Sequence, residues 1–89
     1  MKHFNIRVSG KVQGVFFRAS TKEQADLLGV QGFVRNESNG DVYIEAEGEE
    51  IQLQEFLKWC GRGPSRARVD NLKIEEGLLE KFTRFEVSR

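Results

Sequence analysis

The sequence has only one cysteine, one histidine and one proline, and its net charge is zero. The single cysteine, Cys60, excludes an internal disulfide, and with one histidine there is no cluster typical of a zinc site. A lone thiol suits a reducing compartment, so we expect a cytoplasmic protein. Basic and acidic side chains balance at 14 each, which counts against a dedicated nucleic-acid binder with its usual basic excess.

Long apolar runs are also missing. No stretch approaches the ~20 apolar residues of a membrane-spanning helix, and no signal-peptide pattern precedes the first predicted strand. We therefore expect no membrane association. Hydrophobic residues make up 38% of the 89 residues and charged residues 31%, as in folded globular proteins. At this length we expect one domain over residues 1–89, acting as a monomer.

Hydrophobic periodicity predicts the secondary structure. Helical spacing predicts helices over residues 17–28 and 49–60. Asn39-Gly40 is a strong hairpin signal, and broken alternation between Val69 and Leu72 indicates a β-bulge or a twist. His3 is expected to be an ordinary exposed strand residue. Alternating residues predict strands over residues 3–9, 30–37, 42–48, 67–76 and 82–87.

This order of elements predicts an α+β sandwich. The pattern βαββαβ with a short extra strand is typical of a ferredoxin-like fold, in which two helices cover one face of an antiparallel sheet. Such folds serve many unrelated functions, so the function has to be inferred from particular residues.

A glycine-containing loop joins the first strand to the first helix. Gly10 and Gly14 allow backbone angles that are closed to other residues, and Arg18 follows where the helix begins. This order directs backbone N–H groups toward one point beside the positive end of a helix dipole, and a guanidinium fits two phosphate oxygens. The loop is thus a candidate anion site. From spacing alone, an ordinary turn with a solvated or salt-bridged Arg18 is the simpler interpretation.

Two motifs resemble the signatures of the acylphosphatase family, in family order and at family spacing. The first is V-x-G-x-V-Q-G-V-x-F-R at residues 8–18, and the second is G-F-V-R-N-x-x-x-G-x-V at residues 32–42, with Gly48 in the expected place. The resemblance covers nearly the whole chain. It implies the ferredoxin-like fold and hydrolysis of small acyl phosphates to a carboxylate and inorganic phosphate.

The resemblance also implies roles for particular residues. Arg18 corresponds to the arginine that holds the phosphoryl group, and Asn36 to the residue that positions the attacking water. From the residues alone, Asn36 reads more simply as part of the turn before Asn39-Gly40. Glu37 brings a negative charge near the anion site, which should weaken binding unless its side chain points away. The backbone N–H groups expected to bind the phosphate belong to Gln13, Gly14, Val15, Phe16 and Phe17.

The implied reaction needs no metal and no cofactor. The leaving group is a carboxylate with a pKa of about 4, so it requires no general acid. Phosphoryl transfer through a loose transition state depends on positioning and charge stabilisation. One arginine, a set of N–H donors and one oriented water therefore suffice.

Two other functions remain open at this point. An RNA-binding module of this fold would carry aromatic residues on the outer sheet face, where Phe33 and Tyr43 are expected. A phosphate-binding domain without catalysis would use the same loop. RNA titration separates the first from an enzyme, and turnover of an acyl phosphate separates the second.

Overall fold

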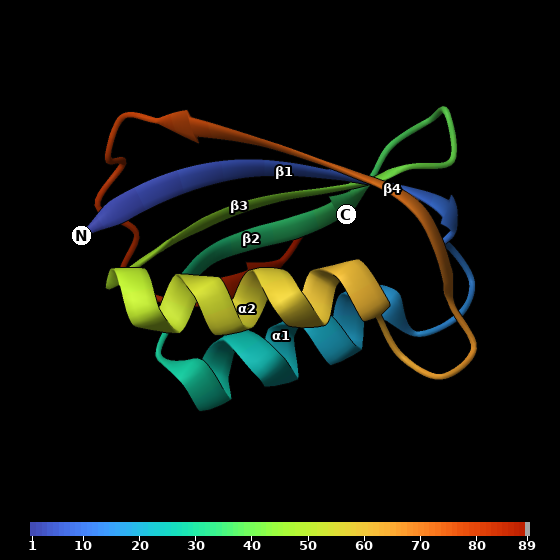
Figure 1. The fold of residues 1–89 in the computed structure, drawn as a ribbon, viewed down its shortest axis with the longest axis horizontal. Coiled ribbons are helices and arrows are strands. Elements are labelled where there is room, and N and C mark those ends of the chain that lie inside the picture. Colours follow the sequence, from blue (N-terminus) through green and yellow to red (C-terminus); the bar gives the residue numbers. More distant parts are fainter. Residues whose placement is uncertain (89) are drawn as a thin grey trace.

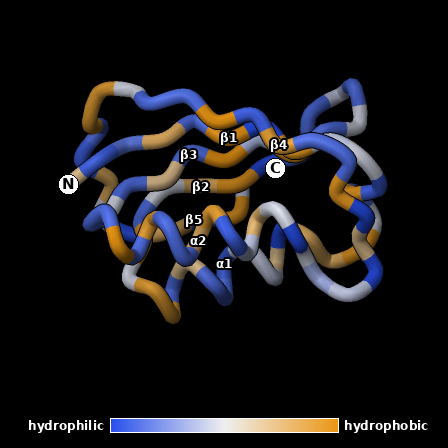
Figure 2. The backbone as a smooth tube through the Cα atoms, in the orientation of Figure 1, coloured by the Kyte–Doolittle hydropathy of each residue, from blue (hydrophilic) through white to orange (hydrophobic). Residues whose placement is uncertain are grey.

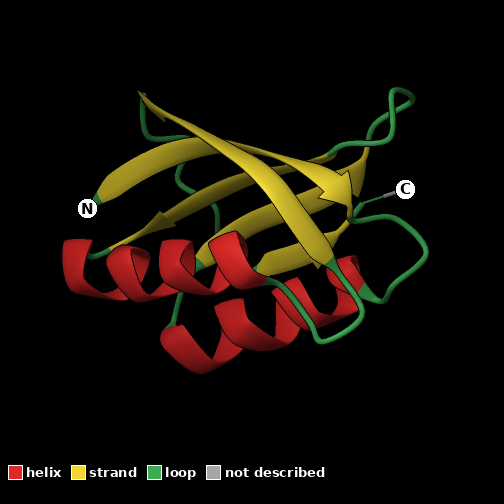
Figure 3. Cartoon of the chain, turned by 45° about the vertical axis from the view of Figure 1, so that its right-hand side comes forward, coloured by secondary structure: helices red, strands yellow, loops and turns green. Residues whose placement is uncertain are grey.

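The computed structural model describes residues 1–88 and has two helices packed on one face of a five-stranded sheet (Figures 1 and 3). The strand order is β4-β1-β3-β2-β5. This arrangement confirms the predicted α+β sandwich. The elements are β1 (Lys2–Lys11), α1 (Phe17–Leu28), β2 (Gln31–Asn36), β3 (Val42–Gly48), α2 (Glu50–Arg62), β4 (Arg68–Gly77) and β5 (Phe85–Val87).

The sheet is mixed rather than wholly antiparallel. Strands β1, β2, β3 and β4 pair antiparallel, but the short extra strand β5 runs parallel to β2. Because β4 ends at the end of the sheet where β2 begins, residues 78–84 cross that end and deliver β5 beside the start of β2. Strand β5 is also shorter than predicted, since the N–H of Phe82 bonds a side chain instead of a strand.

The predicted bulge is present. The register of β1 on β4 shifts between Ser9 and Gly10, which pair with Asn71 and Val69, so that one residue of β4 is left over. Gly10 has φ 128°, and a Cβ there would lie 2.2 Å from the carbonyl oxygen of Arg68. Only glycine fits this close approach, and the bulge turns the chain out of β1 into the loop before α1.

The core lies between the sheet and the helices. Hydrophobic and hydrophilic segments alternate along β1 and β3 in Figure 2, as expected when one sheet face is buried. Gly29 ends α1 in the left-handed conformation, which glycine adopts without strain. Fully buried core residues include Ile6, Val8, Val34, Val42 and Ile44 from the sheet, and Phe17, Ala25, Leu53, Phe56 and Cys60 from the helices.

The expectation that His3 is exposed is wrong. Its side chain is 2% exposed, its Nδ1 lies 2.7 Å from Oε2 of Glu47, and its Nε2 lies 2.8 Å from Oδ1 of Asn5. Glu47 in turn accepts the backbone N–H groups of Glu80 and Phe82. Residues 78–84 therefore cover this part of the outer sheet face, and strand alternation could not reveal that cover.

Both ring nitrogens of His3 face oxygen acceptors, which favours the doubly protonated ring. Burial lowers the pKa of His3, but hydrogen bonds to Glu47 and Asn5 and the nearby Glu45 charge outweigh it and raise the pKa. Burial raises the pKa of Glu47, yet hydrogen bonds from Glu80 N–H, His3 and Phe82 N–H bring it below its ordinary value. The pair is thus a buried ion pair that ties residues 78–84 to the sheet.

Replacing Glu47 with glutamine should lower the free energy of unfolding by on the order of 3 kcal/mol, because it removes the buried carboxylate from the imidazolium of His3 and leaves only the half-buried Glu45, 3.2 Å from its Nε2, as a charged partner. For a domain of this size the melting temperature should fall by more than about 10 °C. Glu55→Gln, on an exposed part of α2, is the matched control and should melt like the wild type. A Glu47→Gln protein that melts with the control would show that the ion pair does not stabilise the fold.

The same pair predicts a pH window for stability. The raised pKa of His3 gives a contribution that is full below its ordinary value of 6.5 and is lost as the pH rises through the raised pKa. The lowered pKa of Glu47 gives a contribution that is full above 4.5 and is lost as the pH falls through the lowered pKa. The difference in melting temperature between wild type and Glu47→Gln should therefore be largest between about pH 4.5 and 6.5.

Candidate active site

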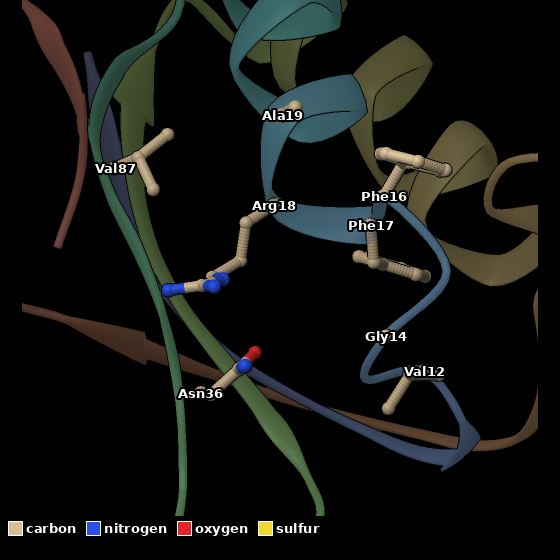
Figure 4. Close-up of a pocket in the computed structure, with 8 residues that line it drawn as sticks. All are labelled: Val12, Gly14, Phe16, Phe17, Arg18, Ala19, Asn36 and Val87. Carbon is tan, nitrogen blue, oxygen red and sulfur yellow. The ribbon is translucent and has the colours of Figure 1, made fainter. Parts of the chain in front are cut away.

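A pocket of about 350 Å³ opens where the β1–α1 loop, the first turn of α1, the end of β2 and the end of β5 meet. Figure 4 shows Arg18 reaching from α1 toward Asn36 at the end of β2. Arg18 belongs to the first sequence motif and Asn36 to the second. The two residues are 18 positions apart in the chain, and the fold places both in the lining of one pocket. Its lining residues are Val12, Gly14, Phe16, Phe17, Arg18, Ala19, Asn36 and Val87.

The backbone of the loop is sharply curled. Gly14 has φ 73° and Phe16 has φ 63°, so two of the three residues 14–16 have a left-handed backbone conformation. For an aromatic residue such as Phe16 this conformation is strained, and strain of this kind concentrates at functional sites. Val12 and Val15 are buried and anchor the loop in the core, as does the adjacent Phe17.

The N-terminus of α1 faces the pocket with its N–H groups available. The first N–H groups of a helix lack partners inside the helix, and no side chain among residues 1–88 caps this turn. No acidic residue stands in the first turn either. A carboxylate there would compete for the positive end of the helix dipole, so its absence favours an external anion.

Gln13 has a structural role that its position in the motif did not reveal. Its Nε2 donates to the backbone oxygens of Glu37 and Asp41, at 2.8 Å each. These bonds tie the loop to the β2–β3 hairpin, next to Asn36. Gln13 therefore sets the distance between the loop and β2 through its side chain, in addition to any contact made by its N–H.

Arg18 is half-buried and points across the pocket. Its Nη1 lies 3.5 Å from the backbone oxygen of Ser88, and within residues 1–88 no carboxylate lies within ion-pair distance of it. Two acidic residues, Asp26 on α1 and Glu37 in the hairpin, are engaged with other basic residues. Asp26 pairs with Lys22 at 2.9 Å, and Glu37 of the hairpin pairs with two other arginines.

Asn36 is the last residue of β2 and faces the helix side of the sheet, as Val34 does. Its Oδ1 is buried and has no hydrogen-bond partner among residues 1–88. Buried polar atoms nearly always have a partner, so this atom is expected to bind a molecule in the pocket. Asn36 does not form the turn, because the hairpin is closed by Glu37 N–H to Asp41 O and by Gly40 N–H to Glu37 O.

The Glu37 side chain points away from the pocket. Its carboxylate lies 2.9 Å from Nε of Arg35 and 3.1 Å from Nη1 of Arg7, on the outer face of the sheet. Hydrogen bonds from Arg35 and then from Arg7 lower the pKa of Glu37. Two guanidinium groups thus neutralise the charge that was expected to disturb the anion site.

The outer face of the sheet carries aromatic residues, but other side chains already pack against their rings. Phe33 and Tyr43 lie with ring centres 6.0 Å apart. The guanidinium of Arg35 lies 4.8 Å from the centre of the Tyr43 ring, and that of Arg7 lies 5.0 Å from it. Bases stack on free aromatic faces in RNA-binding sheets, so this arrangement does not favour RNA. No helix in residues 1–88 is long and apolar enough to cross a membrane.

Comparisons with known proteins identify the family of this chain. The sequence profile of the acylphosphatase family matches residues 4–87. An acylphosphatase from Marinobacter nauticus is 46% identical over 86 residues, which cover 96% of this chain and 94% of that protein. The crystal structure of acylphosphatase from Bacillus subtilis superposes with a TM-score of 0.97, at 36% identity and full coverage of both chains. An acylphosphatase structure from Coxiella burnetii superposes with a TM-score of 0.94, at 40% identity. This match covers 98% of this chain and 92% of that chain. The chain therefore belongs to the acylphosphatase family of enzymes.

Proposed function

We propose that this chain hydrolyses the carboxyl–phosphate bond of small acyl phosphates, with each site residue in a defined role. The guanidinium group of Arg18 donates bidentate hydrogen bonds to two phosphoryl oxygens. Backbone N–H groups bind the phosphoryl oxygens from the other side, where the curled loop meets the start of α1. These donors come from Gln13, Gly14, Val15, Phe16 and Phe17.

Asn36 orients the attacking water. The observation that carries this role is its buried Oδ1, which has no partner among residues 1–88 and is aimed into the pocket that Arg18 also lines (Figure 4). An amide oxygen accepts a hydrogen bond from water and turns a water lone pair toward phosphorus. A phosphoryl oxygen of the substrate takes the proton that the water loses, so the protein needs no general base.

The reaction balances without a metal or a cofactor. An acyl phosphate dianion and water give a carboxylate and dihydrogen phosphate, as the P–O bond to the acyl group breaks and a P–O bond to water forms. The carboxylate leaves unprotonated because its pKa is about 4. The protein supplies position and positive potential, which are what a loose phosphoryl-transfer transition state requires. We propose that it works as a cytoplasmic monomer.

Hydrolysis of benzoyl phosphate tests this function. We expect hydrolysis far above the uncatalysed rate, at a rate proportional to the protein concentration. Removing metal ions by exhaustive chelation should leave this rate unchanged. Binding of inorganic phosphate without any turnover would instead identify a phosphate-binding domain that lacks catalysis. Activity lost on chelation and restored by Mg²⁺ or Zn²⁺ would contradict the metal-free mechanism.

A further inference from the structure

Phe16 is the one aromatic lining residue that the loop holds in solvent. Its side chain is 70% exposed, whereas the neighbouring Phe17 is 2% exposed and packs in the core. The left-handed backbone of Phe16, at φ 63°, turns its ring outward at the rim of the pocket. A glycine would adopt this conformation without strain, as Gly14 does two residues earlier. A strained aromatic residue at this position therefore indicates that its ring has a function.

The position of the ring relative to Asn36 indicates that use. Figure 4 shows Phe16 across the pocket from Asn36, with its ring directed away from Asn36. In phosphoryl transfer the attacking and leaving oxygens lie roughly in line through phosphorus. If Asn36 holds the water, as in the proposed function on which this inference rests, the acyl group leaves on the side of Phe16.

The rim of the pocket is suited to an apolar acyl group. Apart from Arg18 and Asn36, the lining side chains are apolar, and no carboxylate is among them. We propose that Phe16 selects substrates by packing its ring against the acyl group, so that acyl phosphates with an aromatic or extended apolar acyl group are preferred over those with a small one. A ring-on-ring contact of this kind changes rates by roughly fivefold to tenfold.

The test compares the ratio of kcat/KM for benzoyl phosphate to kcat/KM for acetyl phosphate. Phe16→Ala should lower this ratio about fivefold to tenfold, whereas Phe16→Tyr, which keeps the ring, should retain the wild-type ratio. Using a ratio cancels any effect of the substitution on the phosphate-binding backbone, because both substrates present the same phosphoryl group. Leu27→Ala, at an exposed apolar position near the other end of α1, should leave the rates for both substrates unchanged.

A ratio within twofold of wild type in Phe16→Ala would overturn the proposal, even if both rates fall. Such an equal fall would show that Phe16 serves the shape of the loop alone. A wild-type protein that hydrolyses neither substrate would overturn the proposed function, and the acyl-group proposal with it. The two failures are therefore distinguished by the wild-type rates.

Discussion

Replacing Arg18 with alanine should lower kcat/KM for benzoyl phosphate by about a thousandfold or more while the protein stays folded. An arginine that stabilises charge in phosphoryl transfer contributes about 10³-fold to 10⁵-fold. The structural role of Arg18 is slight, since within residues 1–88 its guanidinium makes only the 3.5 Å contact to Ser88 O. Its loss should therefore change the melting temperature by a few degrees at most.

Two further variants make this result specific. Arg18→Lys should recover little activity, because an ammonium cannot bind two phosphoryl oxygens in the same fixed plane. Arg66→Ala, which removes an exposed positive charge after α2, should keep near wild-type activity. Near wild-type hydrolysis by Arg18→Ala would refute the role of Arg18 in phosphate binding.

Asn36→Ala should lower kcat by about 10²-fold to 10³-fold and leave KM nearly unchanged. These magnitudes match the removal of one preorganised polar group from an active site. A residue that orients water without contacting the substrate acts on the chemical step alone, so it changes kcat and kcat/KM equally. Steady-state kinetics with benzoyl phosphate measure both constants.

Asn71→Ala, at an exposed position on β4, is the matched amide control and should have wild-type kinetics. The opposite pattern for Asn36→Ala, a higher KM with an unchanged kcat, would place Asn36 among the substrate-binding residues. The proposed orientation of the water would then be wrong, and with it the expected direction of the leaving acyl group.

The local patterns of the sequence predicted the elements well where packing follows periodicity. Helix α1 was predicted at its observed bounds, because Gly29 ends it and its buried residues, Phe17, Thr21 and Ala25, keep the helical spacing. The loop before it was predicted because glycines and an arginine stand in a fixed order between strand and helix. Residues near each other in the chain carry such signals.

Features that depend on distant segments escaped prediction. The burial of His3 requires residues 78–84 to cross the sheet and donate to Glu47, and nothing near His3 in the sequence signals this cover. The side-chain bonds of Gln13 to the hairpin depend in the same way on how the loop folds back. The strained φ of Phe16 was also unexpected, because aromatic residues rarely adopt it.

The central claim, that Arg18 and the loop form a preorganised phosphate site, is tested most directly by titrating the melting temperature with inorganic phosphate. Wild type should show a saturable rise, worth about 2.7 kcal/mol at a hundred times Kd, because phosphate binds only the folded chain. Arg18→Ala should show only the shallow linear rise that phosphate causes by strengthening hydrophobic burial, and chloride at equal ionic strength should give neither. Identical phosphate responses of wild type and Arg18→Ala would contradict the claim and leave the loop as an ordinary turn.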